Sequence, residues 1–160
     1  MNDNQLFSFN VTTELFDYLK EISISKSYKS GDILLDENDV IRGIPIITKG
    51  SIKVMRTEED GREILLYYIK AGESCVMSFL GETSKVKADV EHDAEILFLP
   101  NSKVSELHKK HPEWLDYIFK LYHKRFEELL DMVNEVTFKK TDDRLLNLLQ
   151  KKSKLSNSKI

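Results

Sequence analysis

The sequence is poor in the residues that form covalent cross-links, metal clusters and membrane spans. Its 160 residues contain one cysteine, Cys75, so an internal disulfide is excluded. An iron–sulfur cluster takes about four thiolates and is likewise excluded in this chain. No apolar run approaches the roughly 20 residues that cross a bilayer, and the first ten residues lack the basic and apolar order of a secretory signal. We therefore expect a cytoplasmic protein without membrane association.

Groupings of catalytic residues are also missing. The four histidines lack the paired spacing of a zinc site or a facial triad, and only His92 lies in the region of the predicted strands, which argues against a cupin-like metal enzyme. The sequence shows neither a nucleophile–base pair nor a phosphate-binding glycine loop, so we expect no enzymatic activity. A haem-binding site is not excluded by the histidine pattern, because haem iron needs only one axial histidine. The histidines are His92, His108, His111 and His123.

Glycine is confined to one part of the chain. All six glycines lie between Gly31 and Gly81, and none occurs in the 79 residues that follow. Short segments rich in Ile, Val, Leu and Tyr separate them, and turn residues at intervals of about 8–12 positions are typical of an all-β sandwich or barrel. The clearest hairpin is residues 51–69, where Asp60-Gly61 supplies the turn. There Ile52 and Val54 alternate with Lys53 and Met55.

Helices are predicted on both sides of the barrel. Thr12 or Thr13 can cap a first helix in which Leu15, Phe16 and Leu19 repeat at helical spacing. Ser102 is the expected cap of a short helix after Pro100. Pro112 suits the first position of a long helix that lacks glycine and internal proline for about 26 residues, or roughly 40 Å.

The long helix carries the strongest evidence for assembly. Apolar residues step by four and three along it for about three heptads, which predicts a coiled-coil seam and a homodimer. A second stripe, with Trp114, Ile118, Leu121 and then Leu130, can pack on the barrel. The seam consists of Leu115, Phe119, Tyr122, Phe126, Leu129, Val133 and Val136.

The end of the chain differs from the rest in charge. Thr141 is the expected cap of a last helix, with Asp142 and Asp143 in its first turn. Six lysines crowd the last 22 residues, either as a solvated face or as a flank that lies beside DNA. The net charge of -3 argues against a main nucleic-acid surface in this chain.

In this order the elements resemble the CRP/FNR regulators, in a branch common in the Bacteroidetes. The motifs are Tyr28 to Asp32 at the barrel entry, a turn at Gly50, EDGRE at Glu59 to Glu63, Gly72-Glu73-Ser74-Cys75, AEILFLP ending at Pro100, and RFEELLDMVNEVTFKKTDDRLLNLL. The resemblance implies a mainly β fold with α, a double-stranded β-helix of the jelly-roll, cyclic-nucleotide-binding-like kind, followed by a long dimerisation helix. It divides the chain into an effector-sensing barrel (1–110), the dimerisation helix (111–139) and the start of a connection (140–160) to a helix-turn-helix absent from this chain.

The resemblance also indicates where an effector would bind, and it argues against cyclic AMP. The family's Gly-Glu pair falls on Val76-Met77 and its phosphate-binding arginine on Ser84, next to Lys85. In the family, two polar residues of the dimerisation helix form hydrogen bonds with the adenine. The corresponding positions here are Leu129 and Leu130, whose side chains cannot form hydrogen bonds. The resulting pocket candidates are Glu73, Ser74, Cys75, Val76, Met77, Ser84 and Lys85.

Each pocket candidate also has a structural interpretation. Cys75 is either a redox target or a small buried hydrophobe, Met77 lines an apolar pocket or fills the core, and Lys85 meets an anion or solvent. The sequence thus predicts a regulator that couples a small-molecule or redox signal to DNA binding. DNA and RNA polymerase would be reached only through the helix-turn-helix, and the effector stays unknown. The alternative is a stand-alone cyclic-nucleotide-binding-like module that acts through a protein partner.

Overall fold

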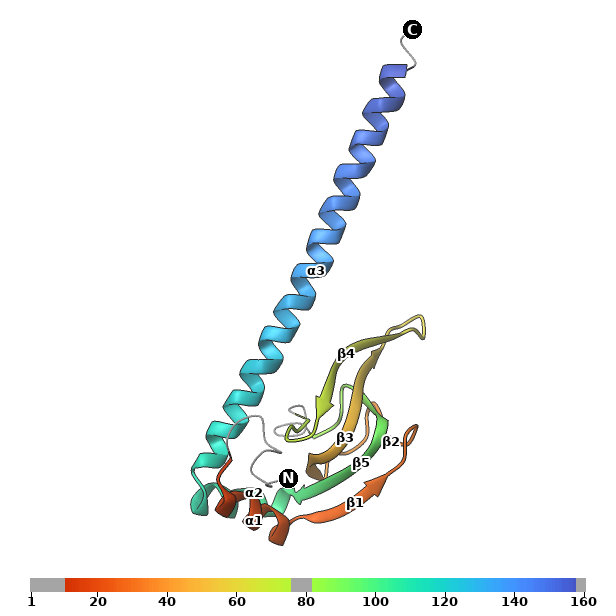
Figure 1. Ribbon diagram of the computed structural model, residues 1–160. Coiled ribbons are helices and arrows are strands. Elements are labelled where there is room, and N and C mark those ends of the chain that lie inside the picture. The colour runs from red at the N-terminus through yellow and green to blue at the C-terminus, as the bar shows by residue number, and fades with distance from the viewer. Residues whose placement is uncertain (1–10, 76–81, 158–160) are drawn as a thin grey trace. The chain divides into compact units, whose positions relative to one another are not determined.

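A computed structural model describes residues 11–75 and 82–157 of the chain. It divides into two units, one that ends at His123 and one that begins at Lys124, and each is described by itself. The elements of the first unit are α1 (Thr13–Ile22), β1 (Ile24–Tyr28), β2 (Ile33–Leu35), β3 (Gly43–Thr57), β4 (Glu63–Lys70), β5 (Lys87–Pro100) and α2 (Asn101–Lys110) (Figure 1). The helix α3 (Glu113–Asn157) begins in the first unit and makes up the second.

The strands form one antiparallel sheet in the order β1-β5-β3-β4, with β2 also paired to β5. Because β5 pairs with β1 and β3 at one end and with β2 and β3 at the other, the sheet curls on itself. The predicted fold class, an antiparallel barrel of the jelly-roll kind followed by a long helix, is confirmed. The predicted hairpin is confirmed too, since Glu58 N–H donates to Arg62 O at 2.8 Å around Gly61, whose φ is 85°.

Two details of the strands differ from the sequence prediction. Gly50 does not end a strand: its φ of 84° accompanies register shifts against β5, so the segments on either side of it form one bent strand, β3. Met55 does not follow the predicted alternation: it is buried like Ile52 and Val54, because Leu66 is an extra residue on β4 and the pairing shifts between Val54 and Met55. A bulge of this kind changes which side chains face the core.

Gly50 is a position where side-chain atoms do not fit. A Cβ there would meet the backbone carbonyl of Asp93 and come within 2.8 Å of Ala94 Cα, whereas a Cβ on Gly61 would meet nothing within 4 Å. Both glycines have positive φ. We therefore expect Gly50→Ala to lower the free energy of unfolding by about 2–4 kcal/mol and Gly61→Ala by only about 1–2 kcal/mol. Equal losses in urea denaturation would show that close approach of β5 does not matter at Gly50.

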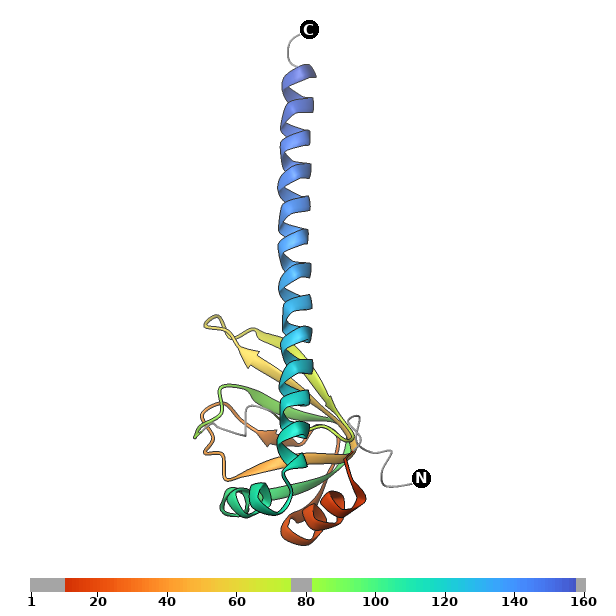
Figure 2. The ribbon, with the colours of Figure 1, turned by 90° about the vertical axis from the view of Figure 1, so that its left-hand side faces the viewer.

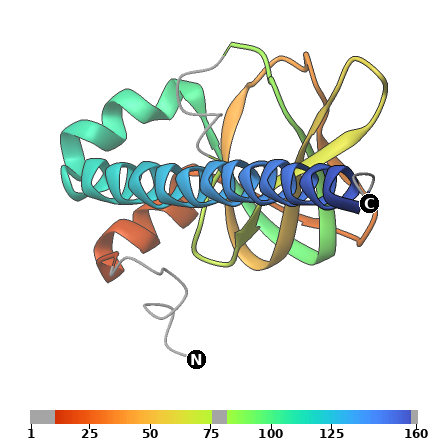
Figure 3. The same cartoon turned by 90° about the horizontal axis from the view of Figure 1, so that it is seen from above.

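The helices α1 and α2 flank the first turns of α3 (Figures 2 and 3). Thr12 caps α1 as predicted, with its hydroxyl accepting from Leu15 N–H at 3.2 Å. The predicted cap Ser102 lies inside α2, which begins directly after Pro100, since the extended proline backbone already ends the strand. The core here joins apolar side chains from α1, α2, α3, β3 and β5: Leu15, Phe16, Leu19, Ile44, Ile46, Leu97, Leu99, Leu107, Trp114, Tyr117 and Leu121.

The helix α3 is longer than predicted, with 45 residues and about 68 Å at 1.5 Å per residue. Pro112 directly precedes it. Thr141 does not cap a separate helix: its hydroxyl donates to Thr137 O at 3.0 Å within the same helix. With no glycine or proline after Pro112, the backbone has no local reason to stop, and this hydroxyl is satisfied one turn back. The domain division at residue 139 stays a prediction.

Candidate functional site

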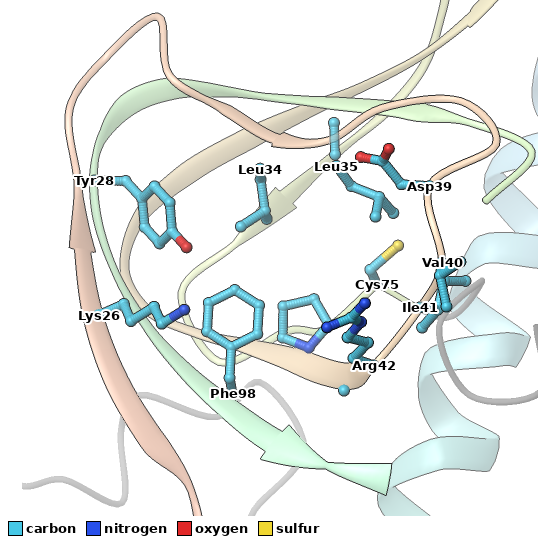
Figure 4. A pocket seen from close by; sticks show the side chains of 13 residues that line it. Lys26, Tyr28, Leu34, Leu35, Asp39, Val40, Ile41, Arg42, Cys75 and Phe98 are labelled. Atoms are coloured by element: carbon cyan, nitrogen blue, oxygen red, sulfur yellow. The ribbon is translucent and has the colours of Figure 1, made fainter. Parts of the chain in front are cut away.

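A cavity of about 490 Å³ opens between the strands of the barrel, on the inner side of β1, β2 and β5 (Figure 4). This volume is in the range of small-molecule sites. Its walls also include the segment that leads into β3 and one residue that follows β4. The lining residues are Lys26, Tyr28, Leu34, Leu35, Asp39, Val40, Ile41, Arg42, Gly43, Pro45, Cys75, Ala88 and Phe98.

The interior of the cavity is apolar. Leu34 and Leu35 of β2 and Phe98 of β5 pack against the second core cluster, which includes buried Cys75 and Ala88. These side chains continue the barrel core to the cavity wall, so a ligand body placed here would contact hydrocarbon. Such an environment favours a ligand with an apolar body.

Two cationic side chains lie at the solvent-exposed edge of the cavity. Lys26 comes from β1, and its Nζ lies 5.2 Å from the centroid of the Phe98 ring. Arg42 comes from the segment before β3, and Figure 4 shows its guanidinium reaching over the cavity. Within the described residues, neither side chain has an ion pair. Both cations are therefore available to a ligand.

Asp39 and Tyr28 complete the polar lining. The Asp39 carboxylate accepts from Asp36 N–H at 2.8 Å, so the loop already uses part of its hydrogen-bonding capacity. The Tyr28 ring lies 6.2 Å from that of Phe98, and burial, followed by the negative charge of Asp32, raises the pKa of Tyr28 above its usual value. The phenol thus stays protonated at neutral pH and can donate a hydrogen bond.

Three of the sequence-predicted pocket residues are buried and bonded to the surrounding loops. Glu73 accepts from Lys70 N–H at 3.1 Å, and Ser74 Oγ donates to Pro45 O at 2.5 Å. Ser84 Oγ donates to Val86 O at 2.6 Å. These bonds hold the turn after β4 and the entry to β5, and none of the three residues lines the cavity.

The remaining candidates are placed differently from one another. Cys75 is buried and lines the cavity, and Figure 4 shows its sulfur directed inward. Lys85 is exposed and lies outside the cavity lining. Val76 and Met77 fall outside the described residues. Of the predicted set, the structure therefore brings Cys75 to this cavity.

The cavity residues Lys26, Tyr28 and Arg42 were not predicted from the sequence. Lys26 and Tyr28 are two positions apart in ISKSY and so share one face of a strand, a signal that could have grouped them. No sequence pattern places Arg42 at the cavity, because it lies in the irregular segment before β3, whose path determines the direction of the side chain.

A hydrogen bond joins the first turns of α3 to the short segment that precedes the cavity residue Cys75. The buried Tyr117 hydroxyl donates to Gly72 O at 3.0 Å, and Gly72 N–H donates to Ile47 O at 2.7 Å. Burial raises the pKa of Tyr122, and the Cys75 thiol adds to this shift. The start of the helix thus contacts the residues that lead into the cavity wall at Cys75.

The predicted seam of α3 presents its apolar side chains to solvent. Phe119 is 69% exposed, Phe126 61% and Val133 59%, whereas Trp114 and Leu121 of the second stripe are fully buried. The predicted packing of the second stripe is confirmed for Trp114, Ile118 and Leu121, whereas Leu130, its last member, is 47% exposed. The other seam residues are Leu115, Tyr122, Leu129 and Val136, of which Tyr122 is half-buried and the rest are exposed.

The described residues hold no cluster of three or more histidine, cysteine or acidic side chains that could bind a metal ion. Within them, no helix combines the length and the apolar composition needed to cross a membrane.

Comparison with known proteins agrees with this architecture. The family model of the cyclic nucleotide-binding domain matches residues 25–111, more than half of the chain. The chain belongs to this family. The matched residues cover the strands β2 to β5 and nearly all of β1, together with α2, and so include the whole cavity lining. The cyclic-nucleotide-binding-like domain that the resemblance implied is thereby confirmed. No curated protein matches significantly.

Solved structures of transcription regulators share the fold. The catabolite activator protein of Thermus thermophilus is 22% identical over 80% of this chain and 61% of its own, with a TM-score of 0.68. The c-di-GMP responsive regulator CLP of Xanthomonas campestris is 17% identical over 79% of this chain and 65% of its own, with a TM-score of 0.73. Oxidized CprK in complex with o-chlorophenolacetic acid is 18% identical over 81% and 54%, with a TM-score of 0.65. The chain therefore spans less than two thirds of the length of these regulators.

Proposed function

We propose that this chain is the effector-sensing and dimerising part of a transcription regulator. In this proposal a small molecule binds in the barrel cavity, α3 pairs with α3 of a second copy, and the ligand state of the cavity sets the geometry of the pair. As such a regulator, the protein would act in the cytoplasm and have no catalytic activity of its own. DNA and RNA polymerase would be reached through a helix-turn-helix domain.

The observation that carries this proposal is the bond from Tyr117 to Gly72. It joins the helix to the four-residue segment that ends at Cys75 in the cavity wall. A buried hydrogen bond is costly to break without a replacement partner, so a shift of this segment would be passed to the first turns of α3. Two-state changes in sensors commonly act through packed elements of this kind.

The dimer part of the proposal rests on the exposed seam. Large apolar side chains spaced by four and three residues along an exposed helix are typical of a surface that pairs with another helix. The seam ends at Val136, because the same spacing continues onto Lys140, Asp143 and Asn147, which are polar. Leu145 and Leu148 are exposed apolar residues outside it.

Solved relatives support an effector other than cyclic AMP. CLP is described as responsive to c-di-GMP, and CprK was solved with o-chlorophenolacetic acid. In this chain, the position of the phosphate-binding arginine is Ser84, whose hydroxyl is used within its own loop. Proteins of this fold thus respond to different molecules, and this chain lacks that anion-binding side chain.

A fusion experiment tests the proposed function. We expect the chain, joined through its C-terminus to a helix-turn-helix domain that binds its operator only as a dimer, to raise operator affinity at least about 100-fold through effective concentration. The measurement is an operator-binding titration of the fusion and of the isolated domain. Equal affinities would contradict the proposal.

A further inference from the structure

We propose that the barrel cavity binds a hydrophobic carboxylate, whose acid group pairs with Arg42 and Lys26 and whose apolar body lies against β2 and β5. This inference rests on the proposed function in that it names the effector class of the same cavity. It is carried by the arrangement of the lining: hydrocarbon inside, with two cations at the exposed edge.

The interior selects an apolar ligand body. Leu34, Leu35 and Phe98 form a continuous apolar wall with buried Cys75 and Ala88. A ligand part that carries many donors and acceptors would lose its bonds to water without regaining them on this wall. A short alkyl chain or an aryl ring has nothing to lose there, and it buries apolar surface.

The edge of the cavity selects a negative charge. Arg42 and Lys26 reach the cavity from different segments, the first before β3 and the second on β1, and within the described residues neither has an ion pair. A guanidinium offers two parallel donors to a carboxylate, and an ammonium adds a second charge that tolerates varied geometry. In the proposal, one ligand carboxylate at the edge pairs with both groups while its body enters the interior.

The acidic residue of the lining does not cancel these cations. The Asp39 carboxylate accepts from Asp36 N–H at 2.8 Å, and Asp39 O accepts from Ser84 N–H at 2.9 Å, so both groups are bonded within the loop. Within the part of the chain that the structure describes, the lining carries two cations and one anion, which leaves a net positive charge. A cationic ligand would find only Asp39, and a neutral one would use neither cation.

A cyclic nucleotide fits this lining less well than a hydrophobic carboxylate. Its purine and ribose carry polar groups over most of their surface, and among the described residues the lining offers the polar side chains of Lys26, Tyr28, Asp39 and Arg42. The carboxylate of the proposal instead needs only Arg42, Lys26 and the Tyr28 hydroxyl.

Calorimetric titration of the whole chain tests this inference with defined probes. Octanoate and 4-phenylbutyrate are the acids, octanamide and 4-phenylbutyramide are their neutral counterparts, and 3′,5′-cyclic AMP is the third arm. We expect the acids to bind at least about 10-fold more tightly than the amides, which corresponds to one charge-assisted hydrogen bond. Their affinity should fall with added salt, because the cations are exposed.

Matched variants locate the binding to the cavity edge. We expect Arg42→Gln and Lys26→Gln each to weaken octanoate binding about 10-fold or more. The controls Arg56→Gln and Lys29→Gln remove the same charges outside the cavity lining, since Arg56 lies at the end of β3 and Lys29 pairs with Asp93 at 3.2 Å. These controls should leave the affinity within about twofold of the unchanged chain.

The outcomes separate the ligand class from the function. Equal binding of acids and amides, no effect of Arg42→Gln, or tighter binding of cyclic AMP would each overturn the carboxylate proposal and leave the proposed function standing. No binding of either acid at millimolar concentration by a chain that passes the fusion test overturns the carboxylate proposal alone. A chain that binds no probe and also fails the fusion test overturns both.

Discussion

Replacing Phe126 with Asp is expected to convert the proposed dimer into a monomer. Phe126 is 61% exposed in the single chain and lies in the middle of the seam, so pairing of two α3 helices would bury it. Two carboxylates would then lie in an apolar interface without partners, which costs about 3–5 kcal/mol and raises the dissociation constant by roughly 100- to 4,000-fold. Light scattering at micromolar concentration should fall from about twice the chain mass of 18.6 kDa to that mass.

Leu148→Asp is the matched control for this measurement. Leu148 has the same exposed fraction, 61%, on the same helix, but it lies beyond Val136, where the four-three spacing meets polar residues. The control should keep the mass of the dimer. A monomer in the unchanged chain, or loss of the dimer in both variants, would refute the seam from Leu115 to Val136.

Trp114→Ala is expected to destabilise the first unit more than any other single truncation at its helical core. Trp114 is fully buried, its ring lies 5.2 Å from that of Tyr117, and it belongs to the cluster that joins α1, α2 and α3 to the sheet. Truncation leaves a cavity and loses about 3–5 kcal/mol, or roughly 6–20 °C in melting temperature for a chain of this size.

The matched control removes an aromatic side chain from the same helix. Phe119 is 69% exposed, and Phe119→Ala should change the free energy of unfolding by about 0.5 kcal/mol or less. Both variants are made in the Phe126→Asp background, so that dimer formation does not contribute, and calorimetry measures the melting temperature. If Trp114→Ala costs no more than Phe119→Ala, the core described around Trp114 is wrong.

The parts of the fold that depend on local spacing could be predicted from the sequence. Thr12 caps α1, Gly61 makes the hairpin turn, and Trp114 and Leu121 face the core, because caps, turns and helical faces each depend on residues a few positions apart. The same reasoning failed at Thr141, where a good capping residue lies inside a continuous helix. A cap residue favours a helix start but does not create one.

The parts that depend on distant pairing could not be predicted in the same way. The predicted turn at Gly50 and the predicted alternation through Met55 were wrong. Register shifts against β5 and β4 bend β3 at Gly50 and change which of its side chains face the core. The cavity likewise needs Lys26, Arg42, Cys75 and Phe98 together, from four segments spread over more than 70 residues. The motif-based candidates instead follow one continuous stretch, and Glu73, Ser74 and Ser84 of that stretch bond to the loops.

The sequence by itself determined a glycine-punctuated barrel, the helix after Pro112 and the seam along that helix. Each of these follows from a short-range period or from the φ that a glycine permits. Only the tertiary structure decided that β5 pairs with β1, β2 and β3 and curls the sheet around a cavity. Strand register and side-chain direction are set by partners far away in the chain, so Arg42 and Lys26 become neighbours of one cavity only once the barrel has closed.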